Sequence, residues 1–74
     1  MNPYEKEFKQ IGLKIAYYRK LQGLTQEKLA EKLEVATPYI GQIEAPNIYK
    51  PISLSTLFRI AEALDIPAYK FLDF

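Results

Sequence analysis

Two predicted short helices that are separated by only three residues constrain the fold of this chain most. Thr25 is a good N-cap for a helix over residues 26–33. After a connection at residues 34–36, Pro38 is acceptable only in the first turn of a second helix, which we place at residues 37–44. Two short helices joined so closely must cross steeply, and one face of the second helix then protrudes from the core.

The side chains of this helix pair divide into an inner and an outer set. The inner set is small at Ala30, where the helices pass closest, and otherwise fills the crossing with Leu29, Leu33, Val35, Ile40 and Ile43. On the second helix, Ile40 and Ile43 face inward at i, i+3 spacing, and Pro38 and Gln42 lie on the opposite side with Thr37 beside them. The outward face is therefore short, polar and uncharged.

Three more helical segments complete the chain. Their expected bounds are about residues 5–22, residues 54–64 after an N-cap at Ser53, and a short last helix from Ile66 that ends in Phe71, Leu72 and Phe74. In the segment over residues 54–64, the helical period assigns to the core Leu54, Leu57, Phe58, Ala61 and Leu64. Residues 45–51 carry two prolines and an asparagine, so they predict a loop. Together these signals predict one all-α domain of five helices over residues 1–74, with the helix pair at about residues 25–44.

Missing residue types exclude several functions. The chain has no cysteine and no histidine, which argues against disulfides, thiolate nucleophiles, Cys/His metal sites and proton exchange at neutral pH. Asp65, Asp73 and the glutamates have no second group at catalytic spacing, so we expect neither an enzyme nor a bound metal or cofactor. No apolar run approaches the length of a membrane span, and the start from Met1 to Glu5 lacks the apolar stretch of a signal peptide. We therefore expect a cytoplasmic protein without a membrane partner.

The charge of the chain is close to neutral. Ten Lys and Arg against nine Asp and Glu give +1, which is low for a nucleic-acid-binding domain. Residues 1–22 hold five cations against two carboxylates, residues 23–50 three against four, and residues 51–74 two against three. If the helix pair binds DNA, its phosphate contacts must therefore rely on backbone amides, helix N-termini and neutral side chains.

Three stretches in this order and spacing resemble the Cro/CI-type (Xre-like) helix-turn-helix DNA-binding proteins. They are Arg19-Lys20-Leu21-Gln22-Gly23-Leu24-Thr25-Gln26-Glu27-Lys28-Leu29-Ala30, Pro38-Tyr39-Ile40-Gly41-Gln42-Ile43-Glu44, and Leu54-Ser55-Thr56-Leu57-Phe58-Arg59-Ile60-Ala61-Glu62-Ala63-Leu64. The resemblance implies a lambda-repressor-like fold and a transcriptional regulator, a homodimeric repressor on a palindromic double-stranded DNA operator. A phage Cro-like repressor, a restriction-modification controller and an antitoxin with a toxin partner all fit.

The same resemblance implies roles for individual residues. Base edges are read in this family at the positions of Thr37, Pro38 and Gln42, of which only Gln42 has an amide suited to bidentate pairing with adenine. The DNA backbone is contacted from positions matching Gln26, Tyr39, Gly41, Asn47, Tyr49 and Lys50. Arg19 and Glu44 match a structural ion pair of the family.

Three positions depart from the family pattern. Glu34 stands where the turn usually has glycine, and a left-handed conformation there costs on the order of 1 kcal/mol relative to glycine. Ala36 replaces the usual Ser or Thr cap of the second helix, so Thr37 or a water would have to cap it. Pro46 replaces a glycine and deletes a backbone N–H in the loop.

Two alternatives remain open. Phe71, Leu72 and Phe74 either seal the core or form a dimer patch, and the resemblance favours the dimer patch. The low charge and the two prolines Pro38 and Pro46 also suit a protein–protein interaction module that keeps the fold but reads no bases. Binding to DNA that falls with salt would separate the two functions.

Overall fold

The structure, a computed structural model, describes residues 3–74, so Met1 and Asn2 of the start considered above lie outside the described residues. Its elements in chain order are α1 (Glu5–Leu21), α2 (Gln26–Leu33), α3 (Thr37–Glu44), α4 (Leu54–Leu64) and the 3-10 helix η1 (Ala68–Leu72). The all-α class is confirmed, since residues 3–74 contain no strand.

The prediction of five α-helices is wrong. Residues 3–74 contain four α-helices, and the last predicted helix is the 3-10 helix η1. This segment has only five residues after Pro67, and its turn is closed by an i to i+3 bond of 3.1 Å from Lys70 N to Pro67 O. Such tight turns are typical of short connecting pieces, which do not extend far enough to form i to i+4 bonds.

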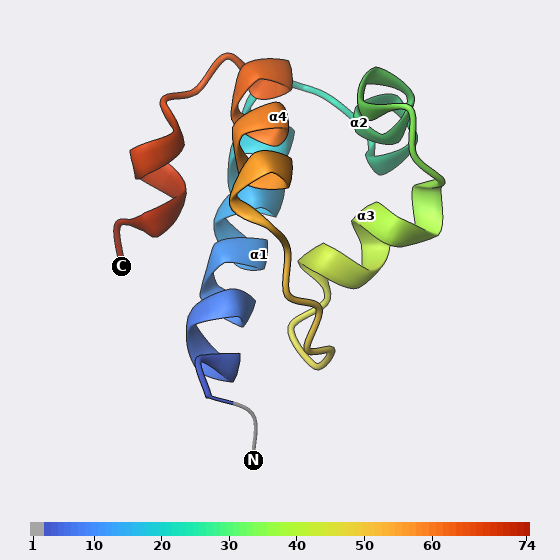
Figure 1. Cartoon of the computed structure of the whole chain (residues 1–74). Helices are drawn as coiled ribbons and strands as arrows, with labels where there is room; N and C mark the ends of the chain where they lie inside the picture. The colour runs from blue at the N-terminus through green and yellow to red at the C-terminus, as the bar shows by residue number, and fades with distance from the viewer. Residues whose placement is uncertain (1–2) are drawn as a thin grey trace.

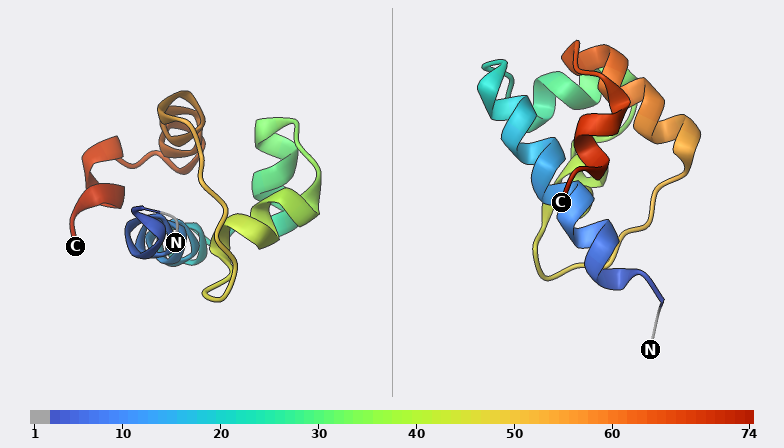
Figure 2. Two further views of the ribbon diagram at one scale, coloured as in Figure 1. Left: turned by 60° about the horizontal axis from the view of Figure 1, so that its bottom comes forward. Right: turned by 90° about the vertical axis from the view of Figure 1, so that its left-hand side faces the viewer.

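The elements are arranged around α1. Figure 1 shows α4 beside α1, with η1 on one side of these two helices and the α2–α3 pair on the other. Helix α3 contacts both α1 and α2, and η1 contacts both α1 and α4. The helix pair is therefore held at the edge of the domain, with one side of α3 away from the other helices (Figures 1 and 2).

One hydrophobic core joins all five elements. Its largest fully buried side chains are Ile15, Leu29, Ile40, Ile60, Leu64 and Phe71. The predicted inward positions Ile40 and Ile43 are both buried, and Ala30 is buried at the helix crossing. The core assignment is wrong for Leu54 and Phe58, which are exposed: Leu54 lines a hollow with Phe8 and Ile11 of α1, and the neighbouring elements leave both side chains uncovered.

The ends of the helices follow local sequence signals. Thr25 Oγ1 accepts a hydrogen bond of 3.0 Å from Lys28 N, and Ser53 Oγ accepts one of 3.1 Å from Thr56 N, so both predicted N-caps are confirmed. Ala36 is the N-cap of α3 and forms no side-chain cap bond, and Thr37 begins the helix. Pro38 in the first turn lacks the N–H that a cap would otherwise satisfy.

Gly12 allows α1 to pass very close to the end of α3. A Cβ atom on Gly12 would lie 2.0 Å from the carbonyl oxygen of Ile43, which is closer than any side chain tolerates. The contact of α1 with α3 therefore requires glycine at this position. The position was not singled out from the sequence, because a glycine inside a helical pattern gives no local sign of what lies opposite.

No helix within residues 3–74 is long and apolar enough to cross a bilayer.

Candidate nucleic-acid interface

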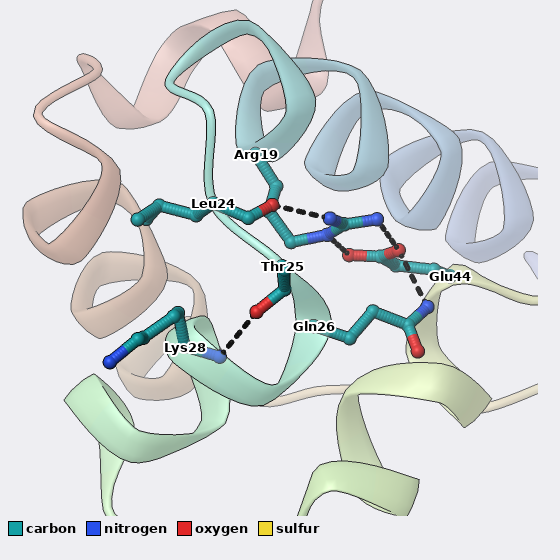
Figure 3. Close-up of polar contacts among 6 residues, drawn as sticks. All are labelled: Arg19, Leu24, Thr25, Gln26, Lys28 and Glu44. Carbon is teal, nitrogen blue, oxygen red and sulfur yellow. Dashed lines mark hydrogen bonds and ion pairs between the residues drawn. The ribbon is translucent and has the colours of Figure 1, made fainter.

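A buried charged network fixes the end of α3 to α1. Arg19 Nε lies 2.7 Å from Glu44 Oε2, and Arg19 Nη2 lies 2.9 Å from Glu44 Oε1 (Figure 3). The side chains of Arg19 and Glu44 are only 8% and 4% exposed. Because both charges are desolvated, each depends on the other for its electrostatic stabilisation.

The same network holds the start of α2. Arg19 Nη1 donates to the carbonyl oxygen of Leu24 at 2.6 Å, and Gln26 Nε2 donates to Glu44 Oε1 at 3.0 Å (Figure 3). Glu44 stands at the C-terminus of α3, where the helix dipole disfavours a negative charge, and three N–H donors compensate for it. The relative placement of α1, α2 and α3 is therefore set by one hydrogen-bonded cluster.

Gln26 serves as a bridge within this cluster. Its side chain is half-buried, and its Oε1 atom lies 3.6 Å from the point where a Cβ would stand on Gly41 of α3. An amide nitrogen carries two N–H bonds, so Gln26 keeps one donor after its bond to Glu44. The phosphate contact predicted for Gln26 is thus compatible with its internal bond, and sequence reasoning alone did not find that bond.

The outward face of α3 carries the side chains predicted to read bases. Pro38 and Gln42 are exposed and Thr37 is half-buried, and the opposite face is in the core. None of these three residues is charged. The face can offer one amide, one hydroxyl and two small apolar groups to a partner that lies against it.

The loop after α3 is fastened at two points by aromatic rings. Lys50 Nζ lies 5.5 Å from the ring centroid of Tyr39 on α3, within the range of a cation–π contact. Tyr49 packs edge-on against Phe8 of α1, with 6.0 Å between the ring centroids. Asn47, which precedes both in the loop, is exposed. The loop therefore presents Asn47 and Lys50 beside α3, and the predicted backbone residues Tyr39, Gly41 and Tyr49 are half-buried neighbours.

The C-terminal aromatic cluster is divided by the structure. Phe71 is fully buried and contacts Tyr18 edge-on at 5.4 Å, so it seals the core and cannot belong to an exposed dimer face. Leu72 and Phe74 are exposed. Leu72 and Leu54 line one hollow of about 240 Å³, which puts an exposed residue of α4 next to the end of η1.

One further contact of the site was not predicted, and one expected departure from the family pattern takes a left-handed conformation. The Arg59 guanidinium donates from Nη2 to the carbonyl oxygen of Leu33 and so connects α4 to the C-terminal end of α2, where a cation is favoured. Glu34, the C-cap of α2, has φ 57° and ψ 43°, so the left-handed turn that usually has glycine is formed here by glutamate. Residues 3–74 bring together no group of three potential metal-ligating side chains.

Comparison with known proteins places this geometry in a family. The sequence pattern of the family described as Helix-turn-helix matches residues 15–71. The HTH-type transcriptional regulator SinR of Bacillus subtilis is 36% identical over 63 residues, which are 85% of this chain and 56% of SinR. The HTH-type transcriptional regulator PrpR of Mycobacterium tuberculosis is 35% identical over 60 residues, 81% of this chain but 12% of PrpR. The chain thus spans about half or less of the length of these relatives.

Solved structures agree with this placement. The restriction-modification controller protein C.AhdI from Aeromonas hydrophila superposes with a TM-score of 0.80 at 27% identity, over 89% of this chain and 97% of that one. SinR, a master regulator for biofilm formation solved in complex with DNA, superposes with a TM-score of 0.76 at 36% identity, over 85% of this chain and 98% of that one. The matched pattern includes α2, α3 and α4 and all residues of the polar cluster that connects α1, α2 and α3, and the chain belongs to the Cro/CI-type (Xre-like) helix-turn-helix family.

Proposed function

We propose that this protein is a sequence-specific double-stranded DNA-binding transcriptional regulator that represses as a homodimer on a palindromic operator. The observation that carries the proposal is the exposed, uncharged outward face of α3, held by the buried Arg19–Glu44 network. A major groove admits one helix, and there Gln42 has the amide needed for bidentate pairing with adenine. Thr37 offers a hydroxyl and a methyl group, and Pro38 offers apolar contact.

Backbone contacts then come from both ends of the helix pair. At the start of α2, Gln26 keeps one N–H donor and the helix N-terminus favours an anion. In the loop after α3, the donors are the exposed Asn47 and Lys50, which lies over the ring of Tyr39, and Gly41 and Tyr49 complete the proposed backbone contacts. Few of these donors are cations, so affinity should fall with salt less steeply than in strongly basic domains.

Dimerisation is supported by a second exposed surface. Leu54, Phe58 and Leu72 form what we term the α4 patch, in which Leu54 and Leu72 share a hollow. An isologous contact through this patch would give the dimer a two-fold axis, which is the symmetry of an operator whose half-sites lie about 34 Å apart. Phe74, also exposed at this end of the chain, is the other remaining residue of the predicted dimer face.

The relatives support the regulatory role without selecting its type. SinR was solved with DNA, and C.AhdI is a restriction-modification controller. A Cro-like repressor, a controller of that kind, and an antitoxin with a toxin partner are all consistent with a cytoplasmic regulator of this size. A toxin or methyltransferase gene beside its own would distinguish them.

A gel-shift titration tests the proposal. The probe is the DNA upstream of the protein's own gene, the control is the same DNA with its sequence scrambled, and both are measured at two salt concentrations. We expect tighter binding to the upstream DNA and a loss of affinity at the higher salt. Equal and weak binding to both probes would favour the protein–protein interaction module instead, which the near-neutral charge also suits.

A further inference from the structure

The outer side of α1 carries an apolar stripe that neither the core nor the DNA-binding proposal uses. Leu13, Tyr17 and Leu21 are 49%, 59% and 64% exposed. They follow one another at i, i+4 and i+8, so they form a continuous ridge along one side of the helix. The left panel of Figure 2, which looks nearly along α1, shows η1, α4 and α3 around it and its remaining side uncovered. We call these three residues the α1 stripe.

The surface beside the α1 stripe is hollowed. A hollow of about 490 Å³ is lined by Leu13, Tyr17, Phe74 and three neighbours on α1. A second hollow of about 650 Å³ toward the start of α1 shares Gln10 and Leu13 with it, but its lining contains two glutamates as well as two lysines, so the positive part of this surface is the hollow beside Tyr17. Hollows beside a ridge of this kind accept the side chains of another helix by ridge-into-groove packing, whereas the surface of a bilayer has no side chains to place in them.

Lysines flank the α1 stripe. Lys6 and Lys20 stand seven residues before and after Leu13, which puts them on the same side of α1, and both are exposed. Lys14 is one of the residues that line the hollow beside Tyr17. The carboxylates of α1, Glu5 and Glu7, are confined to its first turn, where Glu5 lies 3.2 Å from Lys9.

The charge around the stripe is therefore positive over most of its length. From residue 8 to residue 26 the sequence contains no carboxylate. The segment at the C-terminal end contributes one charge of each sign, Lys70 and Asp73. By contrast, residues 51–58, which carry two members of the α4 patch, contain no charged residue at all.

This difference decides which occupant each surface fits. In an isologous dimer a surface contacts a copy of itself, so pairing through the α1 stripe would bring lysines of both copies together. The α4 patch has no such obstacle. We propose that the α1 stripe is the docking site for an amphipathic helix of another protein, whose apolar ridge is flanked by Asp and Glu. The site goes beyond DNA binding and does not depend on it.

Nuclear magnetic resonance titration of the whole chain tests the proposal. The probe is a synthetic amphipathic helical peptide with leucines on one side and glutamates on both flanks, and the control peptide has lysine in place of every glutamate. We expect the glutamate peptide alone to shift the amide signals around Leu13, Tyr17 and Leu21. The double substitution Lys14→Glu and Lys20→Glu should weaken its binding by about tenfold, because two attractions become repulsions.

Matched variants separate the two apolar surfaces. Leu13→Ser with Tyr17→Ser should abolish peptide binding, whereas Leu54→Ser with Phe58→Ser should leave it unchanged and reduce self-association in sedimentation. All four residues are exposed, so circular dichroism should show folded variants. Their gel shifts serve as an independent readout, since a failure of DNA binding leaves the peptide result intact.

Several outcomes would overturn the proposal. They are equal binding of the lysine peptide, signal shifts confined to the α4 patch, loss of self-association on substitution of the α1 stripe, and no saturable binding up to about millimolar peptide. Binding to phosphatidylserine vesicles by way of the same residues, without binding of the glutamate peptide, would assign the surface to anionic membranes instead.

Discussion

The outward face of α3 and the outer side of α1 are both exposed helix surfaces, but they differ in charge and in support. The α3 face is uncharged and stands on a buried network of Arg19, Gln26 and Glu44. The α1 side carries lysines around an apolar stripe, and within residues 3–74 its side-chain polar contact is the partly exposed pair of Lys9 and Glu5. Residues 1–22, which include most of α1, thus hold five of the ten Lys and Arg side chains, whereas the outward face of α3, which we propose reads bases, holds none.

This separation has a consequence for recognition. A base-reading face without charge discriminates by hydrogen bonds and methyl contacts, which depend on placement to within fractions of an ångström. A charged docking surface tolerates looser geometry, because Coulomb attraction changes gradually with distance. The buried network of Arg19, Gln26 and Glu44 therefore supports the surface for which recognition requires accurate placement. Substitutions in either surface can test this difference.

The largest effect should follow from removing the support of α3. Glu44→Gln leaves the Arg19 guanidinium buried without its countercharge, which we expect to lower the free energy of unfolding by about 3 to 5 kcal/mol. Urea denaturation followed by circular dichroism measures the change. The double variant Arg19→Met with Glu44→Leu removes both charges and should recover most of the loss.

The exposed pair on α1 supplies the matched control. Lys9→Ala removes a contact of 3.2 Å between side chains that are 30% and 41% exposed, so the loss should stay below about 0.5 kcal/mol. Similar losses for Glu44→Gln and Lys9→Ala would contradict the claim that the two surfaces differ in support.

The next largest effect concerns the contact through which α1 holds α3. Gly12→Ala places a Cβ 2.0 Å from the carbonyl oxygen of Ile43, so one helix must shift, and we expect a loss of about 3 kcal/mol. Alanine is the better helix former by about 1 kcal/mol, so a stabilised variant would show that the two backbones do not meet there. Gly12→Ser, which is larger still, should be at least as unstable in the same urea titration.

Truncation of Gln42, which we propose to read a base, should weaken binding to the operator and leave the thermal stability of the protein unaltered. Gln42→Ala should weaken operator binding by about 1 to 3 kcal/mol, with the melting temperature almost unchanged, because the side chain is exposed. Gel shifts measure the loss, and Gln22→Ala, which truncates an exposed glutamine just beyond α1, is the control. An operator affinity that is the same in both variants would remove Gln42 from the interface.

Some features of the structure could be predicted from the sequence alone. Local signals were sufficient for the bounds of α2 and α3 and for the caps Thr25 and Ser53, because a cap acts within three residues of its own position. The period of α4 identified an apolar helix, but it could not show that Leu54 and Phe58 stay exposed, because exposure depends on how the other elements pack around α4.

Long-range placement accounts for the rest of what was missed. The close approach at Gly12, the bond of Gln26 to Glu44 and the bond of Arg59 to Leu33 each join residues 18 or more positions apart. Such contacts depend on how whole helices pack, and no local pattern encodes that. For the same reason Phe71, apolar like its neighbours, belongs to the core, and Leu72 and Phe74 do not.

The smallest effect concerns the turn between α2 and α3, which sets the direction of the outward face of α3. Glu34 is left-handed at φ 57°, and Glu34→Gly should raise the free energy of unfolding by up to about 1 kcal/mol, since glycine adopts this conformation without steric strain. Asp65 has nearly the same angles at the end of α4, and Asp65→Gly should gain less, because aspartate tolerates the left-handed region better than glutamate. The comparison of the two urea midpoints isolates the backbone effect from the loss of one negative charge, which both variants share. If Asp65→Gly gains as much as Glu34→Gly, the charge rather than the backbone determines the change. If Glu34→Gly relieves strain without moving α3, the ratio of the affinities for operator and scrambled DNA should stay unchanged.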